Sequence, residues 1–199
     1  MTSGAVPVGV LALQGDFREH IAVLASLGAD ARPIRRESEL AEVRGLVIPG
    51  GESSVMDKLS RAFGLAEPLK DAIRSGLPVY GTCAGLIMLA DRILDGIPGQ
   101  QSLGGLDVAV RRNAFGSQLD SFETDIDIPS LGEPPVHAVF IRAPVVESVA
   151  DDVTVLAALA DGRIVAVEQG PLLGTSFHPE MTGDTRFHEY FLQKIQTAS

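Results

Sequence analysis

The sequence has one cysteine, no tryptophan, and only 16 lysine and arginine residues against 26 aspartate and glutamate residues. With Cys83 as the single thiol, the chain can form no internal disulfide and no zinc site of several thiolates, and a reducing cytoplasm suits it. The formal net charge of -10 argues against nucleic-acid binding, because clustered basic side chains are needed to hold phosphate groups. The expected partner is therefore a small molecule or another protein.

Long apolar segments are also missing. The apolar run at residues 8–13 is far shorter than the roughly 20 residues that span a bilayer, and residues 1–7 carry no basic side chain of the kind that begins a signal peptide. We therefore expect no membrane anchor and no targeting segment. Nothing in the sequence indicates a metal or a bound cofactor.

The composition is that of an ordinary folded protein. Of 199 residues, 45% are hydrophobic and 21% are charged, which is typical of globular chains. A chain of this length buries most of the surface that it would expose when unfolded. We expect residues 1–199 to form a single domain.

Strands and helices alternate in the first half of the predicted structure. Apolar runs that end at glycine or proline indicate buried strands, and apolar residues at helical spacing indicate helices. Such alternation predicts an α/β fold with a mostly parallel sheet. The predicted strands are 8–13, 31–35, 45–48 and 77–80, and the predicted helices are 16–27, 53–63, 67–74 and 84–93.

The second half has a different pattern, with short strand candidates and one late helix. The glycine-rich residues 95–105 separate the two halves, and their length suits a surface loop better than a linker between domains. Additional strands are thus expected beside the parallel sheet. They lie at 106–110, 122–128, 136–141, 153–159, 164–167 and 172–176, followed by a helix at 186–195.

The segment Gly81-Thr82-Cys83-Ala84-Gly85 stands between a predicted strand and a predicted helix. Glycine two positions to either side of the central residue is the pattern of a nucleophile elbow, a sharp turn that exposes the central side chain. A helix N-terminus and a nearby imidazolium favour the thiolate form of cysteine. Cys83 is therefore the predicted nucleophile. The alternative is that Cys83 is a small core residue, as many lone cysteines are.

A cysteine nucleophile needs a group that accepts a proton and later returns one to the leaving atom. His178 is the predicted base, because Glu180 lies two positions on and would project to the same side of an extended chain. Glu180 could then orient the imidazole, as the acid of a catalytic triad does, or it could be a simple surface carboxylate. The other histidines, His20, His137 and His188, are interpreted as structural or solvated.

Pro49-Gly50-Gly51-Glu52-Ser53 ends a buried strand and opens a predicted helix. Such a helix start offers unpaired backbone N–H groups to an anion. We predict that the N–H groups of Gly51 and Ala84 hold the oxyanion that forms when a thiolate adds to an acyl carbon. Taken alone, this segment is equally an ordinary turn before an ordinary helix.

These three segments, in this order, resemble the class I (triad) glutamine amidotransferases. Further segments narrow the resemblance to the glutaminase subunits of pyridoxal 5'-phosphate synthase, and the match runs nearly end to end. Ser54 and Met181 are two mild departures, since threonine and leucine are common there. The further segments are Leu13-Gln14-Gly15, Arg18-Glu19-His20, Arg112-Asn113-Ala114-Phe115-Gly116, Asp120-Ser121-Phe122 and Phe140-Ile141-Arg142-Ala143-Pro144.

The resemblance implies a three-layer flavodoxin-like fold, with helices on both faces of the sheet. It also implies that the chain hydrolyses L-glutamine to L-glutamate and ammonia through a cysteine thioester. The ammonia would pass, within a large hetero-oligomeric complex, to a synthase subunit. That subunit would combine it with a pentose phosphate and glyceraldehyde 3-phosphate to make pyridoxal 5'-phosphate.

Further roles follow from the resemblance alone. Glutamine would bind against Gly51, Glu52, Ser53, Arg112, Ile141 and Arg142. The two arginines suit a ligand that carries a carboxylate, although either could be a surface cation or a salt-bridge partner. Gln14, Gly15 and Gly50 would sense the partner, because the oxyanion hole in this family is completed when the synthase docks.

Three other interpretations stay open. A glutaminase that supplies another acceptor, such as one in the imidazole glycerol phosphate pathway, would carry the same triad. A gamma-glutamyl cysteine hydrolase would use the same elbow. A flavodoxin-like regulatory module would use Cys83 only as a thiol that senses oxidation.

Overall fold

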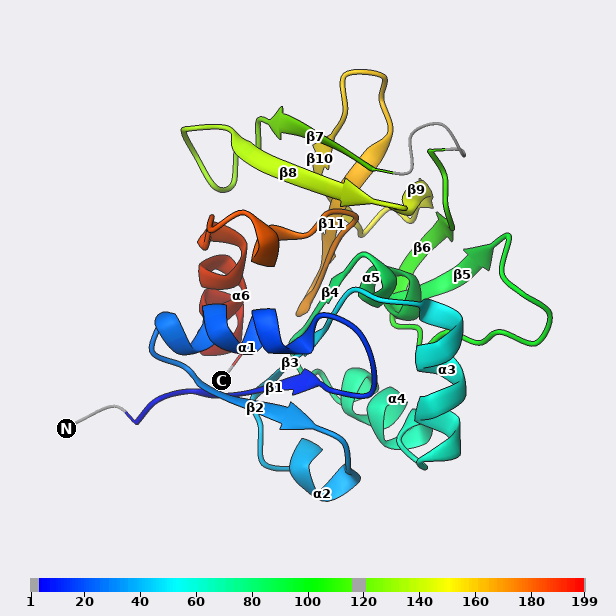
Figure 1. The fold of residues 1–199 in the computed structure, drawn as a ribbon, viewed down its shortest axis with the longest axis vertical. Helices are drawn as coiled ribbons and strands as arrows, with labels where there is room; N and C mark the ends of the chain where they lie inside the picture. The colour runs from blue at the N-terminus through cyan, green and yellow to red at the C-terminus, as the bar shows by residue number, and fades with distance from the viewer. Residues whose placement is uncertain (1–3, 116–120, 199) are drawn as a thin grey trace.

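The structure is a computed structural model that describes residues 4–115 and 121–198. Gly116 and Asp120, which belong to two of the motifs above, lie outside the described residues. Its largest element is a ten-stranded sheet covered by helices on both faces (Figure 1). A separate two-stranded ribbon completes the described strands. The predicted α/β fold, with helices on both faces and added antiparallel strands, is confirmed.

Five neighbouring strands form the parallel part of the sheet, in the order β2-β1-β3-β4-β12. This is the flavodoxin-like order. Strands β3, β4 and β12 are buried along their whole length, which explains why the sequence is apolar on both faces there. Because parallel strands end at one edge, the segments that follow them meet there. The strands are β2 (Asp30–Ile34), β1 (Pro7–Leu11), β3 (Gly45–Ile48), β4 (Val79–Thr82) and β12 (Leu172–Thr175).

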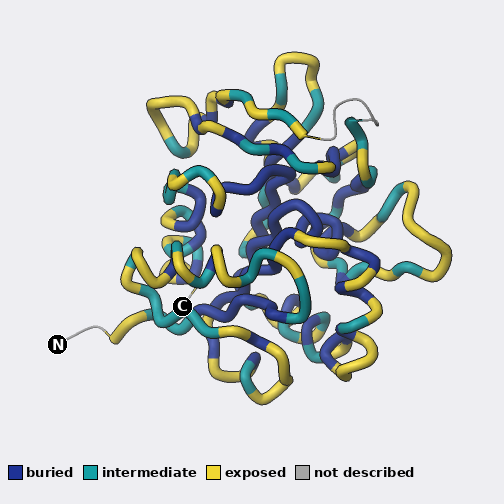
Figure 2. The backbone as a smooth tube through the Cα atoms, viewed as in Figure 1, coloured by how far each residue is buried: buried dark blue, intermediate teal, exposed yellow. Residues whose placement is uncertain are grey.

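The buried side chains form two clusters, one on each face of the sheet. One cluster includes residues of α1 (Phe17–Ser26) and α6 (Arg186–Thr197), and the other includes residues of α3 (Ser53–Ala62), α4 (Ala66–Arg74) and α5 (Ala84–Leu89). Figure 2 shows the buried chain running through the centre, with the exposed segments outside. A membrane crossing would need a longer and more apolar helix than any within the described ranges.

The helix predicted to continue through Ile93 ends at Leu89, so that prediction is wrong. Residues Ala90–Leu94 instead form β5, which pairs in parallel with β6 (Leu106–Arg111). All six residues of α5 are buried, whereas β5 is partly exposed at the edge of the sheet. The apolar spacing fits both structures, and pairing with a strand that is distant in sequence decides between them.

Two further elements were not predicted. The four-residue helix α2 (Glu37–Leu40) carries a single buried residue, which leaves no helical periodicity to recognise. Strand β9 (Val145–Val149) pairs antiparallel with β6 and with β11 (Ile164–Gln169). The predicted strand at 153–159 is β10 (Thr154–Ala158), which pairs with β11 beside the main path of the sheet.

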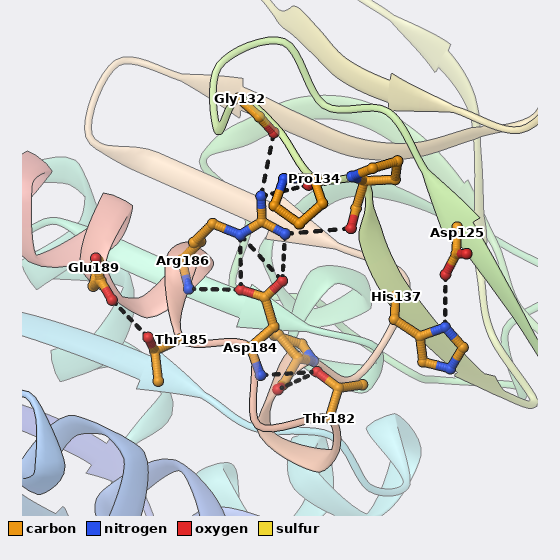
Figure 3. Close-up of polar contacts among 11 residues, drawn as sticks. Asp125, Gly132, Pro134, His137, Thr182, Asp184, Thr185, Arg186 and Glu189 are labelled. Atoms are coloured by element: carbon orange, nitrogen blue, oxygen red, sulfur yellow. Dashed lines mark hydrogen bonds and ion pairs between the residues drawn. The ribbon is translucent and has the colours of Figure 1, made fainter.

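The two-stranded ribbon consists of β7 (Ser121–Ile126) and β8 (Val136–Ile141), paired antiparallel. The backbone N–H of His178 donates to the carbonyl of Val139, 2.9 Å away, and so joins the ribbon to the segment after β12. Arg186, at the start of α6, donates to the carbonyls of Gly132 and Pro134 at 3.2 and 2.6 Å (Figure 3). The ribbon is thus anchored at both of its ends.

Phe140 is the main apolar contact of this ribbon, and we expect its removal to destabilise the protein. Its ring is 1% exposed, stacks on Phe122 at 4.5 Å and meets the edge of Phe177 at 5.6 Å. Phe140→Ala should lower the free energy of unfolding in urea by about 3–5 kcal/mol. Phe63→Ala, at a side chain that is 64% exposed, is the matched control and should change it by less than about 0.5 kcal/mol. Equal losses in the two variants would contradict this packing.

Candidate active site

A pocket of about 430 Å³ opens at the carboxyl edge of the parallel strands. Its walls come from the segments that follow β1, β3, β4, β6, β8 and β12. Of the predicted site residues, Glu180, Gly15 and Gly50 do not line it. The predicted residues that do are Gln14, Gly51, Glu52, Ser53, Cys83, Ala84, Arg112, Ile141, Arg142 and His178.

Cys83 occupies a turn between β4 and α5, in a backbone conformation that side chains rarely adopt, with φ 51° and ψ -105°. Neither flanking position has room for a side chain, so both must be glycine. A Cβ on Gly81 would lie 2.5 Å from the backbone of Gly85, and one on Gly85 would lie 2.0 Å from the carbonyl oxygen of Ile48. The N–H of Cys83 donates to the carbonyl of Thr175 at 2.8 Å, which ties the turn to β12. Cys83 is 6% exposed and lines the pocket, so it is not an enclosed core residue.

His178 and Glu180 lie side by side behind the pocket. The imidazole Nδ1 and the carboxylate Oε1 are 2.7 Å apart, and the two side chains are 5% and 0% exposed. The expectation of an extended chain here is wrong, because Pro179–Met181 form a turn of 3₁₀ helix. The turn still brings the two side chains together. Glu180 is deeply buried and is therefore not a surface carboxylate.

The pKa of His178 reflects two opposing effects. Burial lowers it, while hydrogen bonds with Cys83 and Glu180 and the negative charges of both groups raise it, to about 10. The Asp16 carboxylate, 3.6 Å from Nδ1, is a second anion beside the ring. At neutral pH the site therefore holds an imidazolium next to the sulfur, the arrangement that favours a thiolate nucleophile.

The turns after β1 and β3 fit closely against each other. The N–H of Asp16 donates to the carbonyl of Gly50 at 3.2 Å, and the N–H of Glu52 donates to Oε1 of Gln14 at 2.9 Å. A Cβ on Gly15 would lie 1.8 Å from the Gly50 oxygen, and one on Gly51 would lie 2.5 Å from Gln14. The Gly50 carbonyl is thereby fixed, and any rotation of the Gly50–Gly51 peptide breaks its hydrogen bond with Asp16.

A set of polar contacts fixes one wall of the pocket. Arg112, whose side chain is 12% exposed, contacts Oε1 of Glu52 at 2.8 Å and Oε1 of Gln100 at 3.0 Å. The Gln100 amide also donates to the hydroxyl of Ser53 at 2.9 Å. Arg142, in contrast, has a positive φ of 45° and no ion pair with any residue in the described ranges. One pocket arginine is thus neutralised by the protein, and the other is available to an anion.

Sequence reasoning missed Gln100 and Asp16. The sequence predicts a surface loop around Gln100, and no spacing rule links this residue to Arg112 and Ser53. It also predicts that the first helix starts at Asp16. Within the described residues, Asp16, His178 and Glu180 form the one group that could offer three ligand atoms to a metal, all within 4.8 Å of one another. Two of the three already share a hydrogen bond, so the group belongs to this pocket.

The remaining histidines lie outside the pocket. His137 is half exposed on the ribbon and bonds to Asp125 and Glu123 at 2.7 and 2.9 Å. These two carboxylates raise its pKa. His20 and His188 are fully buried and bond to each other, and Nε2 of His20 lies 3.5 Å from Glu180. The interpretation of these three as structural or solvated stays a prediction.

The raised pKa of His178 should depend on the neighbouring thiol. We expect Cys83→Ala to lower the pKa of His178 from about 10, because it removes one hydrogen bond and one negative charge. An NMR titration of the imidazole signals measures this, and His137, whose partners are unchanged, is the internal control. The sign for stability follows, since protonated His178 stabilises the fold fully below about pH 6.5, and this contribution is lost as the pH rises through about 10. An unchanged pKa in the variant would contradict the arrangement.

The chain is similar to known proteins along nearly its whole length. The model of the SNO glutamine amidotransferase family matches residues 10–197. The pyridoxal 5'-phosphate synthase subunit PdxT of Leifsonia xyli is 72% identical, with 97% of this chain and 98% of the relative covered. The subunit of the same name from Clavibacter michiganensis is 68% identical, with 96% and 91% covered.

Solved structures agree. A crystal structure titled as a glutamine amidotransferase is 47% identical, with a TM-score of 0.88, and 95% of this chain and 98% of that one are covered. A putative GMP synthase subunit from Thermoplasma acidophilum, at 19% identity and a TM-score of 0.70 over 97% of this chain and 95% of that one, shares the fold. The resemblance seen in the sequence motifs is confirmed, and the chain belongs to the SNO glutamine amidotransferase family.

Proposed function

We propose that this chain is the glutaminase subunit of a pyridoxal 5'-phosphate synthase and hydrolyses L-glutamine to L-glutamate and ammonia. One observation carries the proposal: Cys83 stands on a strained turn, opens into a pocket, and lies beside a hydrogen-bonded His178–Glu180 pair. The identity of 72% to a PdxT subunit, over nearly the whole of both chains, supports the choice of pathway.

In the proposed reaction, the Cys83 thiolate adds to the side-chain amide carbon of glutamine. The tetrahedral intermediate collapses to a thioester when His178 gives its proton to the departing nitrogen, which leaves as ammonia. His178 then accepts a proton from water, which attacks the thioester and releases glutamate and the free thiolate. Glu180 holds the imidazole in place throughout, as the acid of a triad does.

The oxyanion of both tetrahedral intermediates would be held by the N–H groups of Gly51 and Ala84. Ala84 is the first residue of α5, where backbone N–H groups have no partner within the helix. One such donor contributes about 3 kcal/mol to the stability of the transition state. Gly51 lies on the same pocket wall as Cys83 and Ala84.

The proposed glutamine pocket consists of Gly51, Glu52, Ser53, Arg112, Ile141 and Arg142. Arg142 is the better partner for the glutamine carboxylate, since Arg112 is already paired with Glu52. Glu52 is half exposed and offers a carboxylate to the glutamine ammonium group. Arg112 and Gln100 then act by holding Glu52 and Ser53 in position.

Activity would depend on the synthase partner, within a large hetero-oligomeric complex in the cytoplasm. Gln14, Gly15 and Gly50 connect the turn after β1 to the peptide that precedes Gly51. Gly15 is exposed and Gln14 is partly exposed, so a docked partner can reach this turn. A partner that moves it would release the Gly50 carbonyl from Asp16 and permit the peptide to turn.

Loss of the thiol should abolish the glutamine-dependent reaction only. In a complex with a synthase subunit, we expect Cys83→Ala to reduce ammonia release from glutamine at least about a thousandfold. Pyridoxal 5'-phosphate formation from ammonium salts should persist, which controls for folding and assembly. The unmodified chain alone should turn over glutamine more slowly than the complex does. Unchanged ammonia release by the variant would favour a redox-sensing thiol, and preferred cleavage of gamma-glutamyl peptides would favour a hydrolase.

Gln100 should affect substrate affinity more than turnover. Gln100→Leu removes the hydrogen bonds to Arg112 and Ser53, and we expect KM for glutamine to rise about tenfold with little change in kcat. Gln101→Leu, at an exposed neighbour, is the matched control. Steady-state kinetics of the complex measure both variants. A fall in kcat at constant KM would show that Gln100 acts on the chemical step instead.

A further inference from the structure

A chain of buried polar side chains continues behind the proposed triad. Oε1 of Glu180 is occupied by His178, but Oε2 is buried and has no hydrogen-bond partner among the residues described. Nε2 of His20 lies 3.5 Å from it. A buried carboxylate oxygen without a hydrogen-bond donor destabilises the folded state, and a hydrogen bond from His20 would relieve that cost.

His20 is held from two directions. Its Nδ1 lies 2.8 Å from Nε2 of His188, and its Nε2 lies 3.1 Å from the hydroxyl of Thr82. The three residues come from α1, α6 and β4, and all three are fully buried. Tyr80 is the other titratable group on this side of Glu180, and its hydroxyl bonds to Thr175 instead. The partner left for Oε2 of Glu180 is therefore His20.

Both rings of the pair are neutral at physiological pH. Burial, then electrostatic repulsion by the neighbouring imidazoles of His188 and His178, places the pKa of His20 well below its usual value, and burial lowers the pKa of His188 to about 4. Each ring then carries one proton, and the hydrogen bond between them can run in only two directions.

The surroundings select one direction. Nδ1 of His188 is buried and has no partner among the described residues. If His20 donated to His188, the proton of His188 would sit on this orphaned nitrogen, and a bare nitrogen of His20 would face the Glu180 carboxylate. If His188 donates to Nδ1 of His20, the orphaned nitrogen carries no proton, and the N–H on Nε2 of His20 points toward Thr82 and Glu180. The second arrangement avoids both penalties.

We propose that His20, fixed in its Nε2–H tautomer by His188, is a positioning residue that directs its N–H at Oε2 of Glu180 and thereby holds this carboxyl group correctly rotated against His178. The proposal rests on the proposed function, because it assigns His20 a role in the same reaction. It differs from ordinary core packing, for which only the shape of the two rings would matter.

The first test is the tautomer itself. In the full chain, ¹⁵N NMR of the histidine side chains should show a protonated Nε2 and an unprotonated Nδ1 for His20, and the same for His188. In His188→Gln, whose amide can still donate to His20, the His20 signals should keep this pattern. A proton on Nδ1 of His20 in the unmodified chain overturns the proposal without any activity measurement.

The second test is kinetic, in the complex with the synthase subunit. We expect His20→Leu to lower kcat for glutamine hydrolysis about tenfold or more with KM within about twofold, as loss of a hydrogen bond to a charged group predicts. His20→Gln, which can donate to Glu180, should recover part of the loss. His188→Leu should lower kcat, whereas His188→Gln should stay near the unmodified value. Equal rates for the leucine and glutamine variants at each position would leave only packing and overturn the proposal.

Folding and the underlying function are separated by controls. Formation of pyridoxal 5'-phosphate from ammonium salts should be unchanged in every variant that folds and assembles. If His20→Leu does not fold, the tautomer measurement and the comparison of the two His188 variants still test the role of His20. If the unmodified complex fails to release ammonia from glutamine, the proposed function fails. If it succeeds and His20→Leu matches it, only the role of His20 is rejected.

Discussion

The close approach of α5 to β3 is the constraint on which the pocket depends. With no side chain on Gly85, the backbone of α5 lies directly against the carbonyl oxygen of Ile48. This contact leaves the chain no room for a gradual turn, and Cys83 takes a strained backbone conformation instead. The strain is held by the buried strands on either side. A rigid sheet therefore supports a cysteine that lines the pocket.

The parallel topology explains how distant residues reach that sulfur. Turns that follow β1, β3, β4 and β12 meet at one edge, although they are separated by as many as about 160 positions in the sequence. Each turn supplies a different group. The turn after β1 supplies the polar side chains of Gln14 and Asp16, and the others supply backbone N–H groups, the thiol, and the imidazole with its carboxylate. Direct hydrogen bonds connect them, from Asp16 to Gly50 and from Cys83 to Thr175. The separate turns thus form one connected unit.

The sequence predicted features in which a local pattern determines the structure. The elbow glycines had a steric meaning, and the strand–helix alternation could be followed up to Leu89. The end of α5 could not be predicted, because the same apolar spacing fits a helix and an edge strand, and pairing with β6 decides. Gln100 escapes prediction from the sequence, and His20 is interpreted there as structural or solvated, for a related reason. Each acts through partners that are 12 to 168 positions away, and no local pattern encodes such contacts.

The ribbon of β7 and β8 affects how mutations can change this pocket in evolution. It carries Ile141 and Arg142 to the pocket, but among the described residues it is not hydrogen-bonded as a strand into the main sheet. Two of the residues proposed for substrate recognition, Ile141 and Arg142, therefore lie on a different structural unit from the thiol and the imidazole, whereas the others follow strands of the main sheet. Mutations that reshape the ribbon can alter ligand preference while the sheet and its elbow stay intact. Two hydrogen bonds among the described residues tie these units at the reacting centre, from His178 to the carbonyl of Val139 and from the Cys83 thiol to the carbonyl of Ile141, so these contacts limit their independent evolution.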